Sequence, residues 1–196
     1  IAALSLNGLS DCEVATWNWG IGQNSLVSID GGMYNVGVGI EAGEFITSGD
    51  KNTAVGYQSL GGSNGQLTGS QLTGDENTAL GYHALRQLRG SGKENVCIGA
   101  WAGDDITTGE KNTIIGCFAD APGTSSNQIV IGRSAVGHAD NVMVIGGNGS
   151  SSRPAITAWH PGKDDTTDLG SSDYEFKDLY IDGVAYLDAI GFGTNA

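Results

Sequence analysis

The stretch GDKNTAVGYQS at residues 49–59 has a related copy, GEKNTIIGCFA, at residues 109–119. Both contain the unit N-x-x-[V/I/L]-G, and related units occur before, between and after them. The glycines that end these units follow one another at steps of 17, 17, 25, 18, 17, 16 and 14 residues, and the long step contains an insertion at residues 61–71. Self-similarity at a nearly fixed period is typical of a solenoid. The eight glycines are Gly22, Gly39, Gly56, Gly81, Gly99, Gly116, Gly132 and Gly146.

The length of the repeat selects the kind of solenoid. About 17 residues are too few for a strand plus a helix, but they suffice for two short strands and two turns. The 196 residues include 33 glycines and only three prolines, which favours many tight turns between short strands. We therefore predict an all-β fold, a β-solenoid of about eight coils, over residues 18–149. Residues 1–17 are expected to form a lead-in or cap, and residues 150–196 a linker and a β-rich trimerisation segment.

Two apolar columns of the repeat are expected to build the core. A large aliphatic residue stands immediately before each repeat glycine, and strand alternation predicts that it points into the coil. A second apolar set lies just ahead of the turn glycines and is expected to supply the opposite wall. The first column consists of Ile21, Val38, Val55, Leu80, Ile98, Ile115, Ile131 and Ile145, and the second of Ile29, Ile46, Leu72, Leu88 and Ile106.

A column of asparagines accompanies the turns. Asn stands four residues before the repeat glycine in six units, and Gln128 takes that place in the seventh. These side chains either form an amide ladder that closes the turns or reflect the turn propensity of Asn alone. A glycine stands three residues before most of these asparagines, and we expect a positive φ there. These turn glycines are Gly32, Gly49, Gly74, Gly92 and Gly109.

The column two residues before the repeat glycine carries no charged residue. By the same alternation these side chains are expected to point out of the coil, where a solvated strand would carry polar groups. An uncharged flank along eight coils predicts that another surface covers it, most simply a second copy of the chain. The predicted subunit interface therefore consists of Gly20, Gly37, Ala54, Ala79, Cys97, Ile114, Val130 and Val144.

Charge and composition argue against several function classes. A net charge of −13 disfavours binding to nucleic acid, and no apolar run approaches the roughly 20 residues of a membrane-spanning helix. We predict no catalytic constellation, no cofactor and no metal site, because the histidines and cysteines lack ligand spacing and the acidic residues lie singly or as short pairs in turns. Cys12, Cys97 and Cys117 are odd in number, so they cannot all pair within one chain, and buried thiols are the favoured interpretation.

Four aromatic residues follow the repeat glycine by one or two positions in successive coils. They are Tyr57, Tyr82, Trp101 and Phe118. These rings form either an outer strip that contacts a carbohydrate or another receptor, or a cover for the coil edge or for a seam between subunits.

Several segments resemble known fibre proteins. The units NTAVGYQSL, ENTALGYHAL and TTGEKNTIIG resemble repeats of phage and virus tail-fibre proteins, and they are similar to the head repeats of trimeric autotransporter adhesins, which form left-handed β-rolls. LNGLSDC at residues 6–12 resembles a short segment that often precedes such repeats in fibre-like proteins. TTDLGSSDYEFKDLYIDG at residues 166–183 resembles the segment that precedes an endosialidase-type intramolecular chaperone in tail spikes and fibres.

The resemblance implies an elongated homotrimer that is extracellular or on the virion surface. Such a structural fibre segment would attach to a host-surface glycan or protein receptor and contact other fibre proteins. A chaperone would lie beyond residue 196 or have been removed by self-cleavage. Two alternatives stay open: a bacterial extracellular adhesin or filament subunit, and a polysaccharide-degrading tail spike that uses two carboxylates. Ice binding is less favoured, because Thr53, Thr78 and Thr113 alternate with Val and Ile and form no regular threonine array.

Overall fold

The computed structural model describes residues 12–13, 17–61, 71–147 and 176. The chain divides into two units, residues 1–157 and 158–196, and the solenoid belongs to the first. The described residues contain strands and turns and no helix. The predicted trimerisation segment and the LNGLSDC lead-in fall almost wholly outside them. The strands are β1 (Cys12–Glu13), β2 (Trp19–Ile21), β3 (Val36–Val38), β4 (Thr53–Val55), β5 (Thr78–Leu80), β6 (Val96–Ile98), β7 (Thr113–Ile115), β8 (Ile129–Ile131) and β9 (Met143–Ile145).

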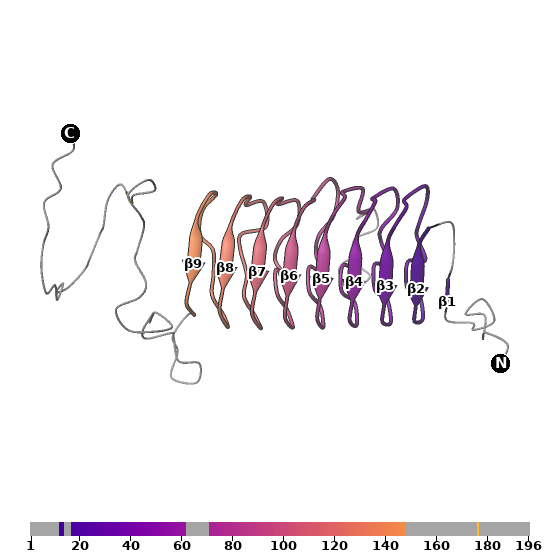
Figure 1. Cartoon of the computed structure of the whole chain (residues 1–196), viewed down its shortest axis with the longest axis horizontal. Coiled ribbons are helices and arrows are strands. Elements are labelled where there is room, and N and C mark those ends of the chain that lie inside the picture. Colours follow the sequence, from indigo (N-terminus) through magenta and orange to yellow (C-terminus); the bar gives the residue numbers. More distant parts are fainter. Residues whose placement is uncertain (1–11, 14–16, 62–70, 148–175, 177–196) are drawn as a thin grey trace, which may run out of the picture. The chain divides into compact units, whose positions relative to one another are not determined.

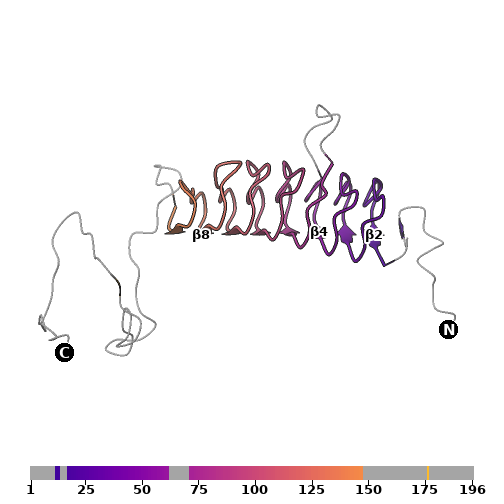
Figure 2. The ribbon, with the colours of Figure 1, turned by 90° about the horizontal axis from the view of Figure 1, so that it is seen from above.

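The strands stack in sequence order into one sheet (Figure 1). Eight of them, β2 to β9, pair in parallel, one strand per coil, and they wind through about seven turns. Equivalent residues of the repeat lie opposite each other, as Ala54 does with Ala79. The short strand β1 covers the outer edge of β2 in the antiparallel direction. Figure 2 shows all the strands on one side of the coils and the turns on the other. The prediction of an all-β solenoid is confirmed.

The predicted alternation of the strands is wrong. Only the middle residue of each three-residue strand points into the coil: Ala54, Ala79, Cys97, Ile114 and Val130 are all fully buried within the single chain. The whole column predicted as the subunit interface (Gly20, Gly37, Ala54, Ala79, Cys97, Ile114, Val130 and Val144) therefore lies on the inner side of the sheet and is not available to a partner. The aliphatic column predicted to lie inside faces outward instead.

The reason for the reversal is the thickness of the coil. A Cβ atom on Gly37 would come within 2.9 Å of the carbonyl oxygen of Ala42 and of Cγ of Leu26. The space between the strand and the opposite wall therefore accepts only small inward side chains in the first coils. The large Val, Ile and Leu side chains next to them must point away from the core.

The opposite wall of the core agrees with its prediction. Ile46, Leu72, Leu88 and Ile106 are almost completely buried, and Ile29 packs against the same cluster while half-buried. The small residues three after the repeat glycine, such as Ala84 and Ala102, are buried beside them. Packing of small residues against large ones fills a narrow interior without voids.

The asparagines form a continuous amide ladder. Asn77 illustrates its bonds: Nδ2 donates to Oδ1 of Asn52 at 2.9 Å and to the carbonyl of Gly92 at 3.0 Å, and Oδ1 accepts from the backbone N–H of Asn95 at 3.1 Å. Gln128 ends the ladder, because its side-chain amide is buried and has no hydrogen-bond partner. Of the two interpretations left open by the sequence, the ladder is confirmed.

The turn glycines are required for a different reason from the one predicted. None of Gly32, Gly49, Gly74, Gly92 and Gly109 has a positive φ. A Cβ atom on Gly32 would instead lie 2.9 Å from the carbonyl oxygen of Thr47 in the next coil. The left-handed position of each turn is the residue just before the ladder, for example Lys51 with a φ of 57°. Close stacking, and not backbone conformation, therefore selects glycine here.

Thiol reactivity tests the corrected orientation of the inner column. We expect Cys97, in a variant with Cys12 and Cys117 replaced by serine, to react with an aromatic disulfide reagent at least about 100-fold more slowly in the folded than in the urea-unfolded protein. Burial raises the pKa of this thiol well above its usual value, and the thiolate is the reactive form. A variant that keeps only the half-buried Cys117 is the control and should react faster. Rapid modification of folded Cys97 would contradict its inward placement.

Candidate functional site

The outward side of the sheet forms a long apolar surface. The first and third residue of every strand point outward, so the eight parallel strands expose two columns of side chains. Of these sixteen residues, thirteen are apolar and three are threonines. We call this surface the sheet face. It consists of Trp19, Val36, Thr53, Thr78, Val96, Thr113, Ile129 and Met143 in one column, and of Ile21, Val38, Val55, Leu80, Ile98, Ile115, Ile131 and Ile145 in the other.

The size of the sheet face is unusual for a surface in contact with water. Seven strand spacings of ~4.8 Å make it ~34 Å long, and the two columns lie ~7 Å apart. Exposure is substantial, for example 46% for Leu80 and 59% for Met143. The exposed apolar area is on the order of 1,000 Å², whereas the largest patch of a typical monomer covers ~300–600 Å². A surface of this size and composition is suited to contact with another protein.

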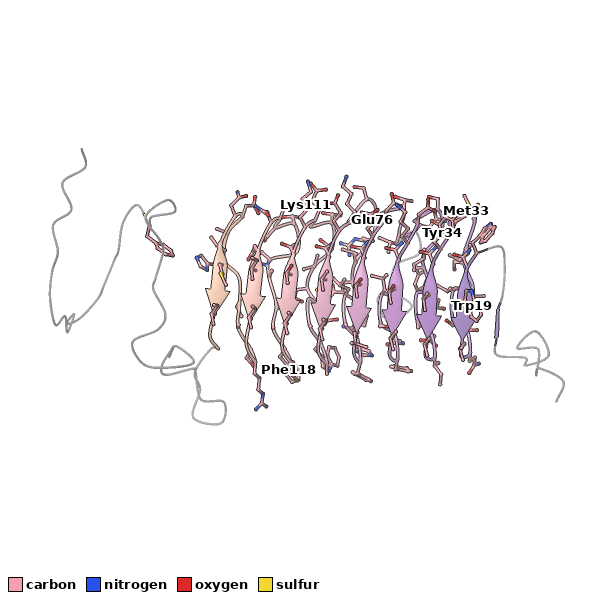
Figure 3. The ribbon with its side chains drawn as sticks, in the orientation of Figure 1. Trp19, Met33, Tyr34, Glu76, Lys111 and Phe118 are labelled. Atoms are coloured by element: carbon pink, nitrogen blue, oxygen red, sulfur yellow. The ribbon has the colours of Figure 1, made fainter. Side chains whose placement is uncertain are left out.

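A charged edge borders the sheet face on one side. Glu76 and Lys111 lie along it in Figure 3. Lys51 Nζ lies 2.8 Å from Oε1 of Glu76, and Lys93 Nζ lies 3.8 Å from Oε2 of Glu110. Exposed pairs of this kind contribute little to stability, but they keep the edge hydrated. The acidic turn residues also act within the fold, since Asp50 Oδ1 accepts the N–H of Met33 at 2.7 Å.

An aromatic edge borders the sheet face on the other side. The structure brings the four predicted aromatic residues together in neighbouring coils. Tyr57 and Tyr82 stack at 5.5 Å with an interplanar angle of 15°, and Trp101 and Phe118 stack at 6.3 Å with an angle of 9°. Within each pair, the flat faces of the rings therefore point toward one another in the direction in which the coils stack. Figure 3 shows Phe118 at the edge opposite Glu76 and Lys111.

His83 completes the aromatic edge and was not singled out by the sequence. Its ring stacks on Tyr82 at 3.9 Å and meets Trp101 edge-on at 4.2 Å. Neither ring nitrogen has a hydrogen-bond partner. Burial lowers the pKa of His83, and the nearby Arg86 lowers it further. Alignment of the repeat units could have assigned His83 to this edge, because it stands two residues after a repeat glycine, as Trp101 and Phe118 do.

Arg86 fixes the position of Trp101. Its guanidinium lies 4.9 Å from the centre of the Trp101 ring, and it donates to both carboxylate oxygens of Asp104, from Nε at 3.0 Å and from Nη2 at 3.2 Å. A bidentate pair of this kind holds the arginine in one orientation. Arg86, Asp104 and Trp101 therefore form one rigid group on the edge.

Asp120 is the most strongly perturbed acid among the described residues. Burial raises its pKa to about 7, and Asp105 and Asp104 add to the shift, although the N–H groups of Ala121 and Asp105 donate to its carboxylate. The folded chain therefore holds a proton that the unfolded chain releases near pH 4. The stability from this group is present below pH 4 and is lost as the pH rises to about 7.

Replacing Asp120 with asparagine tests this balance. The variant keeps an oxygen that accepts from Ala121 and Asp105 and removes the buried charge. At pH 8 we expect the free energy of unfolding of the variant to exceed that of the parent by about 1–2 kcal/mol, after allowance for solvent screening. At pH 4 we expect the two free energies of unfolding to be almost equal. Urea unfolding at both pH values, at one fixed protein concentration, measures the difference. An equal gain at both pH values would show that the charge on Asp120 is not the cause.

No group of three or more histidine, cysteine, aspartate or glutamate side chains that could hold a metal ion occurs in the part of the chain that the structure describes. No helix in that same part is long and apolar enough to cross a membrane. The sequence matches no model of a known protein family, and it matches no curated protein.

Proposed function

We propose that this chain is a structural segment of an extracellular fibre or adhesin, in the manner of a virion tail fibre, that attaches to a host surface as a homotrimer. The observation that carries the proposal is the sheet face, with thirteen apolar residues among sixteen on an acidic chain. The resemblance of the NTAVG-type repeats to tail-fibre repeats supports it. The same resemblance favours a left-handed winding.

The sheet face has the size that a subunit contact needs. A standard protein interface buries ~800 Å² on each partner, and the exposed apolar area here is on the order of 1,000 Å². Copies of the same chain offer a matching surface, because every strand repeats at the same spacing. Three such faces can meet around an axis parallel to the stack of coils.

The charged edge is compatible with this packing. A chain with a net charge of −13 repels its copies unless its acids lie away from the contact. The described sheet face carries no acidic residue, and the Lys51–Glu76 and Lys93–Glu110 pairs lie on the edge beside it. The assembly can therefore bury the face and leave the charges in water.

Attachment follows from rigidity and from the number of copies. The amide ladder and the wall of buried aliphatic residues tie each coil to the next. Three identical flanks on one rod convert weak contacts with a cell surface into avidity, which can exceed a single contact by ~10²–10⁴-fold.

Cell binding tests the attachment function. Fluorescently labelled protein is expected to bind at least one cell type in a panel of bacterial and eukaryotic cells, measured by flow cytometry. Variants that dissociate into single chains should bind at least ~100-fold more weakly, because avidity is lost. Equal binding of assembled and dissociated protein, or binding to no cell type, would contradict the proposal. Release of reducing sugar from those cells would instead favour the polysaccharide-degrading spike, and the neighbouring genes would separate a virion protein from a bacterial adhesin.

A further inference from the structure

The repeat is broken at one place on the charged edge. The residues five and six before the repeat glycine are charged or polar in every coil from residue 50 onward, as in Asp50-Lys51 and Asp75-Glu76. In the first two coils the same positions carry Thr16 and Trp17, and then Met33 and Tyr34. A column that is otherwise hydrophilic therefore becomes aromatic at one end of the solenoid.

These side chains are unusually open to water. Trp17 is 66% exposed, Tyr34 is 54% exposed and Met33 is 41% exposed. Trp side chains are rarely left so open, because they offer more apolar surface than any other residue. Figure 3 shows Met33 and Tyr34 on the same edge as Glu76 and Lys111, while Trp19 lies on the sheet face. The open side chains thus lie beside the proposed subunit contact and not within it.

The backbone beneath them is held firmly. Asn18 Nδ2 donates to the carbonyl of Gly32 at 2.8 Å, and the N–H of Asn35 donates to Oδ1 of Asn18 at 2.8 Å. The N–H of Met33 donates to Asp50 Oδ1 at 2.7 Å. The rings of Trp17 and Tyr34 are 6.0 Å apart and inclined at 40°. The ladder therefore fixes the backbone from which the two inclined rings project, which lowers the entropy cost of binding a ligand.

The dimensions of this group fit a small ligand better than a protein. The three side chains together expose on the order of 300–400 Å², well under the ~800 Å² that a stable protein contact uses on each partner. The group also differs from the Tyr57–Tyr82 and Trp101–Phe118 pairs, whose rings turn their faces to each other. The inclined pair leaves ring surface for an outside molecule.

We propose that Trp17, Met33 and Tyr34 form a platform for an uncharged pyranose sugar of a surface polysaccharide. One face of a pyranose ring carries C–H groups with a slight positive charge, and an aromatic face is negative, so the two attract. Asp50, whose Oδ1 accepts the N–H of Met33, is half-buried beside the group and suits the hydroxyl groups at the rim of a sugar. This carboxylate and the net charge of −13 repel anionic sugars. This inference rests on the proposed attachment function and names its ligand class and position.

The matched variant is Trp17→Asn with Tyr34→Asn. Both positions have a left-handed φ, 68° and 62°, which asparagine tolerates. The repeat itself uses asparagine at the equivalent Asn127 and Asn141. The second variant, Val136→Thr, removes an apolar side chain that is 51% exposed and belongs neither to the sheet face nor to this aromatic group.

Calorimetric titration with maltohexaose, mannohexaose, cellohexaose and chitohexaose, with oligogalacturonate as the anionic probe, tests the proposal. We expect the parent and Val136→Thr to bind at least one neutral oligosaccharide and not to bind the anionic one. The Trp17→Asn, Tyr34→Asn variant should bind at least 10-fold more weakly while its circular dichroism and native mass stay unchanged.

Three results would overturn the platform. The first is an unchanged sugar affinity of the Trp17→Asn, Tyr34→Asn variant, and the second is that the parent binds no neutral oligosaccharide. The third is that the Trp17→Asn, Tyr34→Asn variant dissociates into single chains, because the aromatic group would then be a subunit contact. In the first two cases the attachment function is still tested separately, by the cell-binding measurement.

Discussion

Replacing Leu80 and Ile115 with glutamate is expected to dissociate the assembled protein into folded single chains. Both side chains point outward from the sheet face, with exposures of 46% and 37%. In a trimer the variant would bring six carboxylates into an apolar contact. Burial of an unpaired charge costs several kcal/mol, so association should weaken by about 10⁴-fold or more. The solenoid itself should persist, because neither side chain packs in the core.

The control for this variant places the same charges elsewhere. Val27 and Val136 are exposed to 58% and 51% and do not belong to the sheet face. Val27→Glu with Val136→Glu adds the same charge per chain and should stay assembled. Sedimentation velocity gives the mass of each variant, and circular dichroism shows whether it is folded. If the Leu80→Glu, Ile115→Glu variant has the same mass as the parent, the sheet face is not the contact between subunits.

Replacing Asn77 with alanine is expected to lower the free energy of unfolding by about 3–5 kcal/mol, the largest effect on stability that we predict for one residue. Asn77 lies in the middle of the ladder and is fully buried. Its loss removes the Nδ2 partner of the Gly92 carbonyl and the Oδ1 partner of the Asn95 N–H. Each of these buried groups then loses a hydrogen bond without access to water.

Urea unfolding at a fixed protein concentration measures this loss. Gln23→Ala is the control, because Gln23 carries the same kind of amide on the exposed side of the first corner and should change stability by less than about 0.5 kcal/mol. In a solenoid each coil contacts only its neighbours, so the Asn77 variant should also separate into two unfolding steps more readily than the parent. A loss no larger than that of Gln23→Ala would show that the ladder does not hold the coils together.

The period of the repeat was sufficient to predict the coils and one wall of the core, and it offered the amide ladder as one of two interpretations of the asparagines. Regular spacing places Asn52, Asn77 and Asn95 in line, and it does the same for Ile46 and Leu72, so these predictions needed no knowledge of side-chain direction. Direction was predicted wrongly, because a strand of three residues offers two possible alternations. Residue size was the signal that could have decided it. Gly37 and Ala54 suit the narrow interior, and the larger Val38 and Val55 do not.

The sequence did not predict the features that depend on the corners of the coil. Trp101, Phe118 and His83 adopt a left-handed φ that favours glycine, and their types gave no sign of it. The high pKa of Asp120 arises from its burial beside Asp105, which lies in the preceding coil. The sequence places Trp17 and Tyr34 in one column of the repeat, but their exposure and the approach of their rings were visible only in the structure.

Sedimentation equilibrium of the whole chain over a wide range of concentration shows whether copies of this chain cover the sheet face. We predict a mass of about 60 kDa, three times the 20.1 kDa of one chain. A folded protein that keeps the mass of a single chain at every concentration, with Leu80 and Ile115 open to water, would contradict it.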